Sequence, residues 1–591
     1  MIRDYFRVLI VDLATGKGKV ANVAGRDEVA GGSGLGALLF TKFAKADRPW
    51  NDPEQPVIFA IGPLTGYFPL MSKTVAAFKS PYHDQYAESH AGGRSALALR
   101  FADLDALVLT GQAPRPSALV VGSRHLELKD VHYLWGLDVQ ESGKLLRRMF
   151  HGSGHRSILR IGPAGEQKSA MAGINVDTYR HFGRLGGGGA LGAKNLKAIA
   201  IIGDGSFPLM EGKDYPKLFE AVYQKLTATD MMQKYHNLGT PVNVAVLNEL
   251  KAMPWRNLQA TTDLNAPGIT GERFAETALL RNAACAGCPV GCIHIGFSRE
   301  KFHADYRYFY RQVSYDHEPI FATGSMLGVT DCFAVLDIID VVEQMGLDVM
   351  STGVALAWAT EALEKGVVTE KDTLLPLKFG QNRVYEEAVR HLAFGVNDFY
   401  RLLGQGTLKA AIHYGGADFA CVLGQEMAGY ATGEVFFASQ ALGLRHSHLD
   451  SAGYSYDQTH KDKDVEKAVD FLMADEASRA FLTSMVACLF ARGVYNDELL
   501  AECLKVVGYN ALADTFAAVS RNIQKLRWQT RLATGFNPAS VSIPKRFTEV
   551  TNWKGKVDGE FLAELKNAYA RGLLELGAEA PVEVPGGKGI L

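Results

Sequence analysis

Three cysteines lie within eight residues of one another, in the segment Cys285-Ala-Gly-Cys288-Pro-Val-Gly-Cys292. Thiolates at this spacing are typical of metal sites, and a four-iron cluster takes four of them, commonly from a short run and one distant cysteine. Structural zinc normally uses two separated cysteine pairs, or cysteines and histidines at fixed spacing. The sequence has no second Cys-x-x-Cys, although His294 could complete a zinc site. The spacing therefore favours an iron–sulfur cluster over zinc or inert buried thiols.

The fourth ligand must come from elsewhere in the chain, where the other cysteines are Cys332, Cys421, Cys488 and Cys503. Cys488 falls in a run with helical periodicity, Val465 to Arg492, on the side that apolar residues predict to be buried. A buried cysteine is more often a packing residue than a ligand. Spacing alone does not single out Cys488.

A glycine-rich segment, 183–195, is bracketed by Arg180, Arg184 and Lys194. Glycine lets backbone N–H groups approach an anion closely, and nearby cations complete a phosphate site. The segment matches neither the dinucleotide fingerprint nor the nucleoside-triphosphate loop, and a flexible turn is the alternative. Further glycine-rich stretches, at 31–36, 62–66 and 90–94, suggest a large phosphorylated ligand spread over this part of the chain.

The elements that must position these residues change in character near residue 205. Before it, short β-type runs separated by glycine predict strands at 6–12, 57–61, 75–78, 106–110, 118–121, 157–161 and 198–202. After it, periodicity predicts helices at 215–227, 333–345, 353–365 and 465–492. No internal repeat is apparent. We expect an α+β protein with a β-rich domain at 1–205 and two mainly helical domains at 206–415 and 416–591.

Composition excludes several classes of function. With 591 residues, 47% of them hydrophobic and 21% charged, the chain is typical of a globular protein of several domains. Lys and Arg (62) nearly balance Asp and Glu (64), so nucleic acid and anionic membranes are poor candidate partners. The charged first residues, the lack of a long apolar run and the seven cysteines together favour the cytoplasm.

Several short motifs in order give the chain a resemblance to the tungsten-containing aldehyde:ferredoxin oxidoreductase family, from about Arg7 to about Phe547. The motifs are Gly62-Pro-Leu-Thr-Gly66, Lys79-Ser-Pro81, Ile161-Gly-Pro-Ala-Gly-Glu166, the glycine loop ending in Lys194-Asn-Leu-Lys-Ala-Ile199, the cysteine motif, Gly346-Leu-Asp348, Ser351-Thr-Gly353 and Pro544-Lys-Arg-Phe547. Each is modest evidence alone, and their order makes the set specific.

The resemblance implies a tungsten bis-pyranopterin whose two phosphates are bridged by Mg²⁺, beside one [4Fe-4S] cluster, and molybdenum is an alternative metal. By motif, Lys73 matches a pterin-contacting arginine, while His90 and His181 match residues whose backbone carbonyls hold the magnesium. Arg180 and Arg184 flank the phosphates. The surrounding loops add the cofactor-binding candidates Gly92, Gly93, Gly183, Gly186, Gly188 and Lys194.

In the helical half, the family holds its two pterins with two Asp-x-x-Gly-Leu-Asp/Cys segments, which fall here on 343–348 and 483–488. The first is nearly intact and supplies Glu343, Leu347 and Asp348. The second keeps its cysteine, Cys488, which the resemblance makes the fourth cluster ligand. It has Thr483 and Ala487 at the other contacting positions and Val486 in place of a glycine, and Ser33 stands where the family often has arginine.

The same resemblance places a catalytic glutamate at Glu318 and a histidine at His446, with His448 as the competitor. Aldehyde oxidation adds oxygen at the carbonyl carbon and removes two electrons, so a base must activate water and a donor must polarise the carbonyl. Glu318 is expected to be the base and His446 the donor. A solvated carboxylate and a surface histidine are the alternative interpretations.

The expected function is oxidation of a small aldehyde in an anaerobic cytoplasm, with electrons passed to ferredoxin or a ferredoxin-like subunit. A homodimer or a hetero-oligomer is possible, but Asp337-Ile-Ile-Asp340 replaces the Glu-x-x-His pair with which some relatives bridge subunits through a metal, so no interface metal is predicted. The alternatives are a molybdenum enzyme, a relative that reduces an aromatic thioester, and an electron-transfer subunit that has lost its pterin site.

Overall fold

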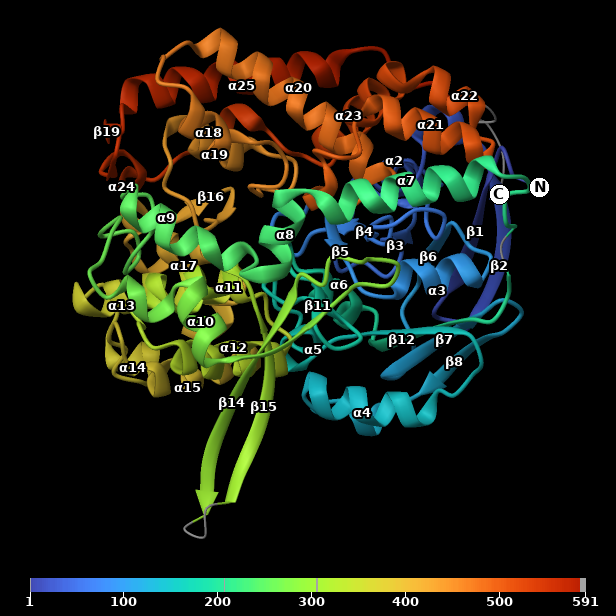
Figure 1. Cartoon of the computed structure of the whole chain (residues 1–591). Helices are drawn as coiled ribbons and strands as arrows, with labels where there is room; N and C mark the ends of the chain where they lie inside the picture. Colours follow the sequence, from blue (N-terminus) through green and yellow to red (C-terminus); the bar gives the residue numbers. More distant parts are fainter. Residues whose placement is uncertain (1, 207, 304–306, 585–591) are drawn as a thin grey trace.

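The computed structural model describes residues 2–206, 208–303 and 307–584. The first third of the chain forms two β-sheets with short helices, and the rest is mainly helical (Figure 1). The α+β class with an N-terminal β-rich region is therefore confirmed. The division of the helical part at residues 415–416 stays a prediction.

The first sheet contains six strands in the order β2-β1-β6-β3-β4-β5. Their bounds are β1 Phe6–Asp12, β2 Lys17–Val23, β3 Val57–Ala60, β4 Thr74–Lys79, β5 Tyr86–Ala91 and β6 Ala106–Thr110. The second sheet has the order β11-β10-β9-β12-β7-β8. Its strands are β7 Ser117–Gly122, β8 Leu126–Asp130, β9 His155–Arg160, β10 Ile174–Val176, β11 Arg180–Phe182 and β12 Leu196–Gly203. All seven predicted strands are present.

The two sheets have the same topology, with β7–β12 repeating β1–β6 one for one. In each, the first strand pairs antiparallel with the second and parallel with the sixth. The third strand pairs antiparallel with the sixth and the fourth, and the fourth with the fifth. The expectation of no internal repeat is therefore wrong. The repeat leaves two marks in the sequence. Ile61-Gly-Pro63 and Ile161-Gly-Pro163 follow the third strand of each sheet, and Ala98-Leu99, Leu104, Ala106 and Gly111 recur at the same spacing as Ala190-Leu191, Leu196, Ala198 and Gly203. We call residues 6–110 the first half and residues 117–203 the second half.

Short helices complete both halves: α1 Arg26–Val29, α2 Gly32–Phe43 and α3 Ser95–Phe101 in the first, and α4 Val139–Met149, α5 Pro163–Glu166 and α6 Gly187–Ala193 in the second. The glycine run forms the buried helix α6, which packs on α5. A Cβ at Gly192 would lie 1.8 Å from the backbone oxygen of Gly165, and one at Gly188 would lie 2.3 Å from that of Gly173. Close helix packing therefore explains these glycines.

The middle of the chain begins with α7 Asp214–Ala228, α8 Asp230–Asn237, α9 Asn243–Glu249 and α10 Gly271–Thr277. A three-stranded sheet follows, made of β13 Leu279–Ala283, β14 Ile293–His303 and β15 Arg307–Tyr315. The β14–β15 hairpin projects from the body of the molecule (Figure 1). The helices α11 His317–Thr323, α12 Cys332–Met345, α13 Val349–Glu364, α14 Glu370–Thr373, α15 Asn382–Phe394, α16 Asp398–Leu403 and α17 Thr407–Tyr414 come next.

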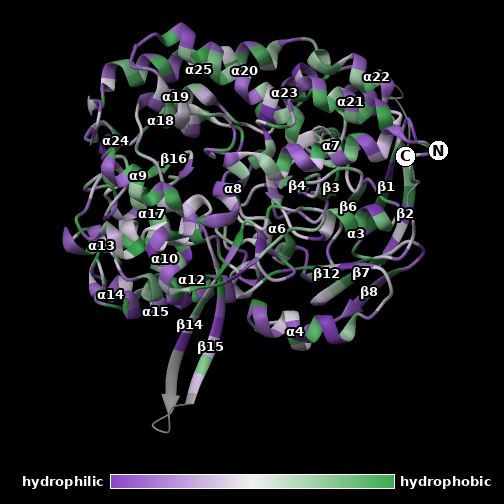
Figure 2. Cartoon of the chain, viewed as in Figure 1, coloured by the Kyte–Doolittle hydropathy of each residue, from purple (hydrophilic) through white to green (hydrophobic). Residues whose placement is uncertain are grey.

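The last part contains the short ladders β16 Val422–Leu423 with β17 Gln425–Glu426 and β18 Thr551–Asn552 with β19 Gly555–Lys556. Its helices are α18 Glu434–Leu442, α19 Gly453–Thr459, α20 Val465–Ser484, α21 Asp497–Val507, α22 Asn510–Asp514, α23 Phe516–Ala533, α24 Lys545–Thr548 and α25 Gly559–Ala578. Hydrophilic and hydrophobic residues alternate along surface helices such as α4 and α25 (Figure 2), as expected for helices that bury one face. No helix of the described residues has the length and apolarity needed to span a bilayer.

One predicted helix ends early. The run 465–492 was expected to be continuous, but α20 stops at Ser484 because Val486 adopts a left-handed conformation, with φ of 57°. The N–H of Ala487 then bonds to the carbonyl of Leu482 at 2.9 Å, as at many helix C-termini. Cys488 therefore lies beyond the helix, where the chain turns back towards the sheets.

Candidate functional site

A cavity of about 390 Å³ lies where both sheet halves meet the helical part. It combines a group of cysteines, several cations, several carboxylates and an apolar end. The residues predicted for the site that line it are Lys73, His90, Gly92, Arg180, His181, Gly183, Arg184, Cys285, Cys288, Cys292, Glu318, Glu343, Leu347, Asp348, Thr483, Ala487 and Cys488.

The four cysteines predicted to bind the cluster share this cavity. Cys285, Cys288 and Cys292 lie between β13 and β14, and Cys488 follows α20. Backbone hydrogen bonds fasten both segments to the first half: Ala286 N donates to Gly93 O at 3.0 Å, and Cys488 N donates to Leu70 O at 2.9 Å. The fold thus brings a distant cysteine to the three-cysteine loop.

The electrostatics of the cysteines fit a group that binds thiolates. Burial raises the pKa of Cys288 to about 12 and that of Cys292 to about 11, so as free thiols both would stay protonated. Burial also opposes ionisation of Cys285, but the Arg180 guanidinium and the Lys73 ammonium bring its pKa below the usual value. Arg180 Nη2 lies 4.0 Å from Cys292 Sγ. Iron would supply the remaining positive charge.

Among the described residues, no three His, Cys, Asp or Glu side chains are placed to hold a single metal ion. A four-iron cluster is larger than an ion and holds its four thiolates farther apart. Gly92 borders this space, because a Cβ there would lie 2.6 Å from Cys285 Sγ. The donor set and the space fit a cluster better than a single zinc.

Buried nitrogen atoms of two arginines and a histidine beside the cysteines have unsatisfied hydrogen-bonding capacity. Arg180 Nε, Arg184 Nε and His181 Nε2 are buried and make no hydrogen bond within the described part of the chain. Three such atoms on β11 and the segment after it are unusual, because buried polar groups are normally paired. They fit a bound anionic group such as the phosphates of a pterin cofactor. Burial lowers the pKa of His181 to about 3, so its ring is neutral.

The two segments expected to hold the pterins approach the cavity in equivalent ways. In the first, Gly346 ends α12 with φ of 72°, and Asp348 N donates to Met171 O at 2.8 Å. In the second, Val486 takes the left-handed position, and Cys488 N donates to Leu70 O at 2.9 Å. Val486 therefore keeps the backbone conformation of a glycine.

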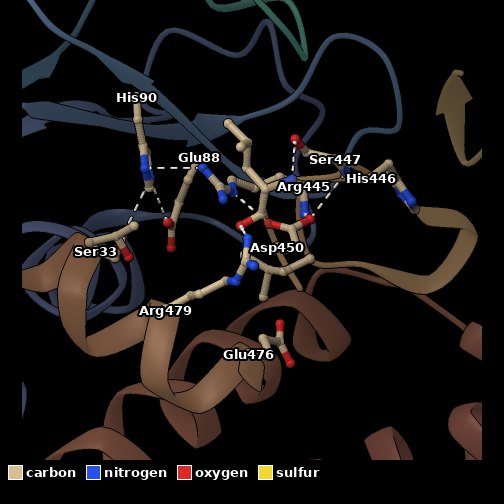
Figure 3. Close-up of polar contacts among 12 residues, drawn as sticks. Ser33, Glu88, His90, Arg445, His446, Ser447, Asp450, Glu476 and Arg479 are labelled. Atoms are coloured by element: carbon tan, nitrogen blue, oxygen red, sulfur yellow. Dashed lines mark hydrogen bonds and ion pairs between the residues drawn. The ribbon is translucent and has the colours of Figure 1, made fainter. Parts of the chain in front are cut away.

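A chain of buried polar contacts lies on the first-half side of the cavity (Figure 3). Glu88 Oε2 and Arg445 Nη1 contact opposite nitrogens of the His90 ring, at 3.1 and 3.0 Å. Arg445 Nε donates to Asp450 Oδ1 at 2.6 Å. Burial and the neighbouring Arg445 lower the pKa of His90 to about 4. The His90 side chain is thus a neutral member of an ion-pair network. Its backbone carbonyl is not used by this network and stays available for the predicted binding of magnesium.

Five predicted residues do not line the cavity: Gly93, Gly186, Gly188, Lys194 and His446. Gly186 and Gly188 lie at the start of α6, where they allow close packing. Lys194 Nζ donates to the carbonyls of Pro53 and Gly111, both at 3.0 Å, so it ties loops together. The glycine-rich segment therefore divides into a cavity-lining part, 180–185, and a packing helix.

Glu318 and His448 form the pair best placed for proton transfer. Glu318 is at the start of α11, and its Oε1 lies 3.4 Å from His448 Nδ1. Its Oε2 accepts a hydrogen bond from Gly429 N at 2.9 Å. Burial raises the pKa of Glu318 to about 8, and burial with the nearby Arg184 lowers that of His448 to about 3.

His446 lies away from this pair. Its Nδ1 contacts Gln440 O at 3.2 Å, its Nε2 lies 2.6 Å from Arg531 Nη2, and its ring packs on His83. The predicted donor role therefore has no support from the geometry, whereas His448 faces the predicted base. The positive φ of His446, 49°, turns the chain so that the residues on either side, Arg445 and Ser447, reach the cavity.

Sequence reasoning also missed Arg445, His317 and Tyr430, which line the cavity. His317 precedes Glu318, and its Nε2 donates to Gly429 O at 3.1 Å, since that carbonyl can only accept. Arg445 and His448 flank the chosen histidine. Proximity in sequence to predicted residues was the only signal for Arg445 and His317, and Tyr430 had none.

Comparisons with known proteins show which family the chain belongs to. The N-terminal domain of aldehyde ferredoxin oxidoreductase matches residues 8–203, and domains 2 and 3 of the same family match residues 217–577. The tungsten-containing aldehyde ferredoxin oxidoreductase of Thermococcus kodakarensis is 28% identical over 93% of this chain and 92% of its own. The WOR-like subunit of an aliphatic sulfonate oxidoreductase from Pyrococcus furiosus is 27% identical over 80% of this chain and 75% of its own.

Among solved structures, the active-site complex BamBC of benzoyl coenzyme A reductase with 1,5-dienoyl-CoA has a chain of similar fold. The TM-score is 0.77 at 18% identity, over 96% of this chain and 95% of that one. Because the identity is low, this similarity concerns the fold alone. The two domain matches together span most of the sequence, and the chain therefore belongs to the aldehyde ferredoxin oxidoreductase family.

Proposed function

We propose that the chain is a tungsten-pterin oxidoreductase that converts an aldehyde into the carboxylic acid and passes the electrons through a [4Fe-4S] cluster to ferredoxin or a partner subunit. One observation carries the proposal: the four cysteines and the Glu318–His448 pair line the same cavity. Both the electron-accepting and the proton-accepting parts of such a reaction thus face one space.

The residues that would hold the cofactors are on the two halves and their helix ends. Cys285, Cys288, Cys292 and Cys488 would bind the cluster. Arg180, Arg184 and the backbone around His90 and His181 would hold the phosphates and Mg²⁺, with Asp348 and Thr483 at the two pterins. When bound, the metal pterin would accept the two electrons that leave the aldehyde.

The Glu318–His448 pair can take one proton from water while the water oxygen adds to the carbonyl carbon. His448 Nδ1 lies 3.4 Å from Glu318 Oε1, and neither atom makes a hydrogen bond within the described residues, so an ionised Glu318 would accept the Nδ1–H of His448. Nε2, on the other side of the ring, then has a lone pair and no hydrogen-bond partner among the described residues. As Nε2 takes the proton from water, the Nδ1 proton passes to Glu318. The overall reaction of aldehyde and water gives the acid, two electrons and two protons.

The raised pKa of Glu318 suits this role, because a carboxylate with a pKa of about 8 holds a proton far better than an ordinary one. The rate should therefore rise with pH as the pair loses its proton near pH 8.

The decisive test compares variants of the two histidines with Glu318→Gln, in protein loaded with metal and iron. We expect Glu318→Gln and His448→Gln to lose about 10²- to 10⁴-fold in kcat with metal and iron content unchanged. His446→Gln should keep most of its turnover, as should the exposed control His413→Gln. Loss with His446→Gln and retention with His448→Gln would instead restore the sequence-based assignment.

Metal analysis of protein purified without oxygen tests the cofactor. Tungsten near one per chain supports the proposed enzyme, and molybdenum at that level supports the same chemistry with the other metal. Iron without either metal would contradict the proposal and favour an electron-transfer subunit.

A further inference from the structure

The end of the cavity beyond Glu318 is built from aromatic rings. Tyr430 lies between His317 and His448, with ring centroids 5.1 and 5.3 Å away. Tyr430 also stacks on Tyr454 at 4.9 Å with an interplanar angle of 24°. Its hydroxyl bonds to Asn243, and burial raises its pKa well above the ordinary value, so it stays a neutral phenol. The surface beside the proton-transfer pair is therefore flat and uncharged.

A second aromatic stack continues this surface. Phe490 lines the cavity and stacks on Tyr235 at 3.8 Å with an interplanar angle of 13°. Tyr430 and Phe490 line the same cavity, so each of the two stacks presents one ring to it. Leu449, with 37% of its surface exposed, lines the cavity and marks where it meets solvent. Apolar groups therefore extend from the opening to the reacting end.

The cations near this end are already engaged. Arg184, which lies near His448, has its Nε 3.7 Å from Asp348 Oδ2, donates to Glu426 O through Nη2, and is the residue proposed above to hold the cofactor phosphates. Arg445 pairs with Asp450 at 2.6 Å, and Arg479 pairs with Asp475 at 2.6 Å. Arg492 Nη1 donates to Leu489 O at 2.9 Å, and its guanidinium also bonds to Tyr235. Lys73 and Arg180, which lack a carboxylate ion-pair partner within the described residues, act on the cysteines at the other end. An anionic substrate group would thus be buried here without a free counter-charge.

Resting on the proposed function, we propose that this end selects an uncharged aldehyde whose substituent is an aromatic ring or another compact apolar group. The ring would lie against Tyr430 and Phe490, with its carbonyl towards His448. Aromatic contacts favour such a group beyond its area alone, and burying an unpaired carboxylate, sulfonate or phosphate is strongly unfavourable. Anionic aldehydes are therefore poor substrates of this chain.

Binding can be measured without turnover, using benzamide as an uncharged and unreactive aromatic carbonyl. Calorimetry on the loaded protein should show benzamide binding at least about tenfold more tightly than acetamide, and no binding of 4-carboxybenzamide. Phe490→Ala should weaken benzamide by about tenfold and leave acetamide unchanged. Phe394→Ala, an exposed phenylalanine at the end of α15, is the matched control and should bind like the wild type. Equal binding of the two amides, or tighter binding of the anion, would overturn the inference.

Kinetics on benzaldehyde, acetaldehyde and 4-carboxybenzaldehyde separate the two proposals. A preference in kcat/KM for benzaldehyde that Phe490→Ala removes supports both. Oxidation of all three at similar rates contradicts the inference and leaves the proposed function standing. Benzamide binding with no oxidation of any aldehyde contradicts the proposed function alone.

Discussion

The two halves of the β-rich region share one backbone plan and differ in the chemistry that they bring to the cavity. A Cβ at Gly62 would lie 2.5 Å from Met485 O, and one at Gly162 would lie 2.5 Å from Met345 O. Each half thus packs a glycine against the end of one long helix, α20 for the first half and α12 for the second. Both halves keep a glycine at this position, because the close approach of the helix leaves no room for a side chain.

The polar groups at these two helix ends differ. The second half meets Glu343 and Asp348, and His181 Nε2 lies 3.7 Å from Glu343 Oε1. The first half meets Thr483 and Cys488, and Ser33 Oγ donates to Thr483 Oγ1 at 3.0 Å. An ionisable contact in one half is replaced by a neutral one in the other. The comparison shows that a duplicated scaffold brings two similar helix ends to one cavity while the polar groups on them differ.

Exchanging the equivalent residues at the helix ends should have the largest effect. Cys488→Asp gives the first half the residue that Asp348 supplies to the second. We expect loss of most of the iron and of the visible absorbance, because a cluster left with three thiolates is poorly held. The buried Cys503→Ala is the control and should retain its iron. Full iron content in Cys488→Asp would show that this cysteine is not a ligand.

Buried carboxylates with opposite responses to pH lie on the two sides of the cavity, Glu88 on β5 of the first half and Glu343 on α12, which packs against the second half. Burial raises the pKa of Glu343 to about 8 from an ordinary 4.5. Burial acts the same way on Glu88, but the Arg527 guanidinium, 2.8 Å away, and His90 outweigh it and hold the pKa of Glu88 below the ordinary value. Glu343 therefore contributes stability that is complete below pH 4.5 and is lost as the pH rises to about 8. Glu88 contributes stability that is present above pH 4.5 and is lost as the pH falls further.

Denaturation of cofactor-free protein at several pH values tests this difference. Glu343→Gln should reduce the decline of the unfolding free energy between pH 5 and 8 by up to about 1.4 kcal/mol per pH unit. Glu88→Gln should leave the pH dependence of the unfolding free energy between pH 5 and 8 unchanged, and it should reduce the loss of stability below pH 4.5. Identical pH profiles for the two variants would contradict the assigned environments.

Much of this architecture was predictable from the sequence, because buried strands and amphipathic helices leave local patterns. The seven strands were predicted from such local patterns, and the cysteine loop was predicted from a short motif. The repeat was missed although Ile61-Gly-Pro63 and the segment Ala98 to Gly111 both recur, as Ile161-Gly-Pro163 and Ala190 to Gly203, because the two pairs of motifs are separated by different distances in the sequence. A topology can be kept by buried apolar residues of many kinds.

The site was predicted less completely, for reasons that are also physical. Lys194 and Arg184 are equally cationic in sequence, yet only tertiary packing decides that Lys194 bonds to carbonyls while Arg184 lines the cavity. His446 and His448 are two residues apart, and the left-handed turn at His446 decides which ring faces Glu318. Val486 could not be expected in a conformation that β-branched residues rarely adopt.

The left-handed positions give a smaller effect that separates the two helix ends. Gly346→Ala should destabilise the protein by more than about 2 kcal/mol, because it adds left-handed strain and its Cβ would lie 2.7 Å from Gly162 N. Val486→Ala should cost only about 1 kcal/mol, since the loss of buried methyl groups is partly offset by relief of β-branched strain. Chemical denaturation measures both. A larger loss for Val486→Ala would mean that its packing outweighs its strain.

The neutral contact of the first half gives the smallest expected effect. Ser33→Ala should cost about 1 kcal/mol, because Thr483 loses a buried donor and keeps only its own bond to Ala480 O at 3.1 Å. Thr483→Val should cost a similar amount by leaving the Ser33 hydroxyl without this acceptor. In the double variant both polar partners are gone, so the combined loss should be smaller than the sum, with a coupling of about 0.5–1 kcal/mol. That coupling should not change between pH 6 and 9, because neither hydroxyl titrates there. A coupling that grew or vanished with pH would show that the neighbouring His90 ring, 3.3 Å from Ser33 Oγ, governs the contact and that the first half is as dependent on ionisation as the second.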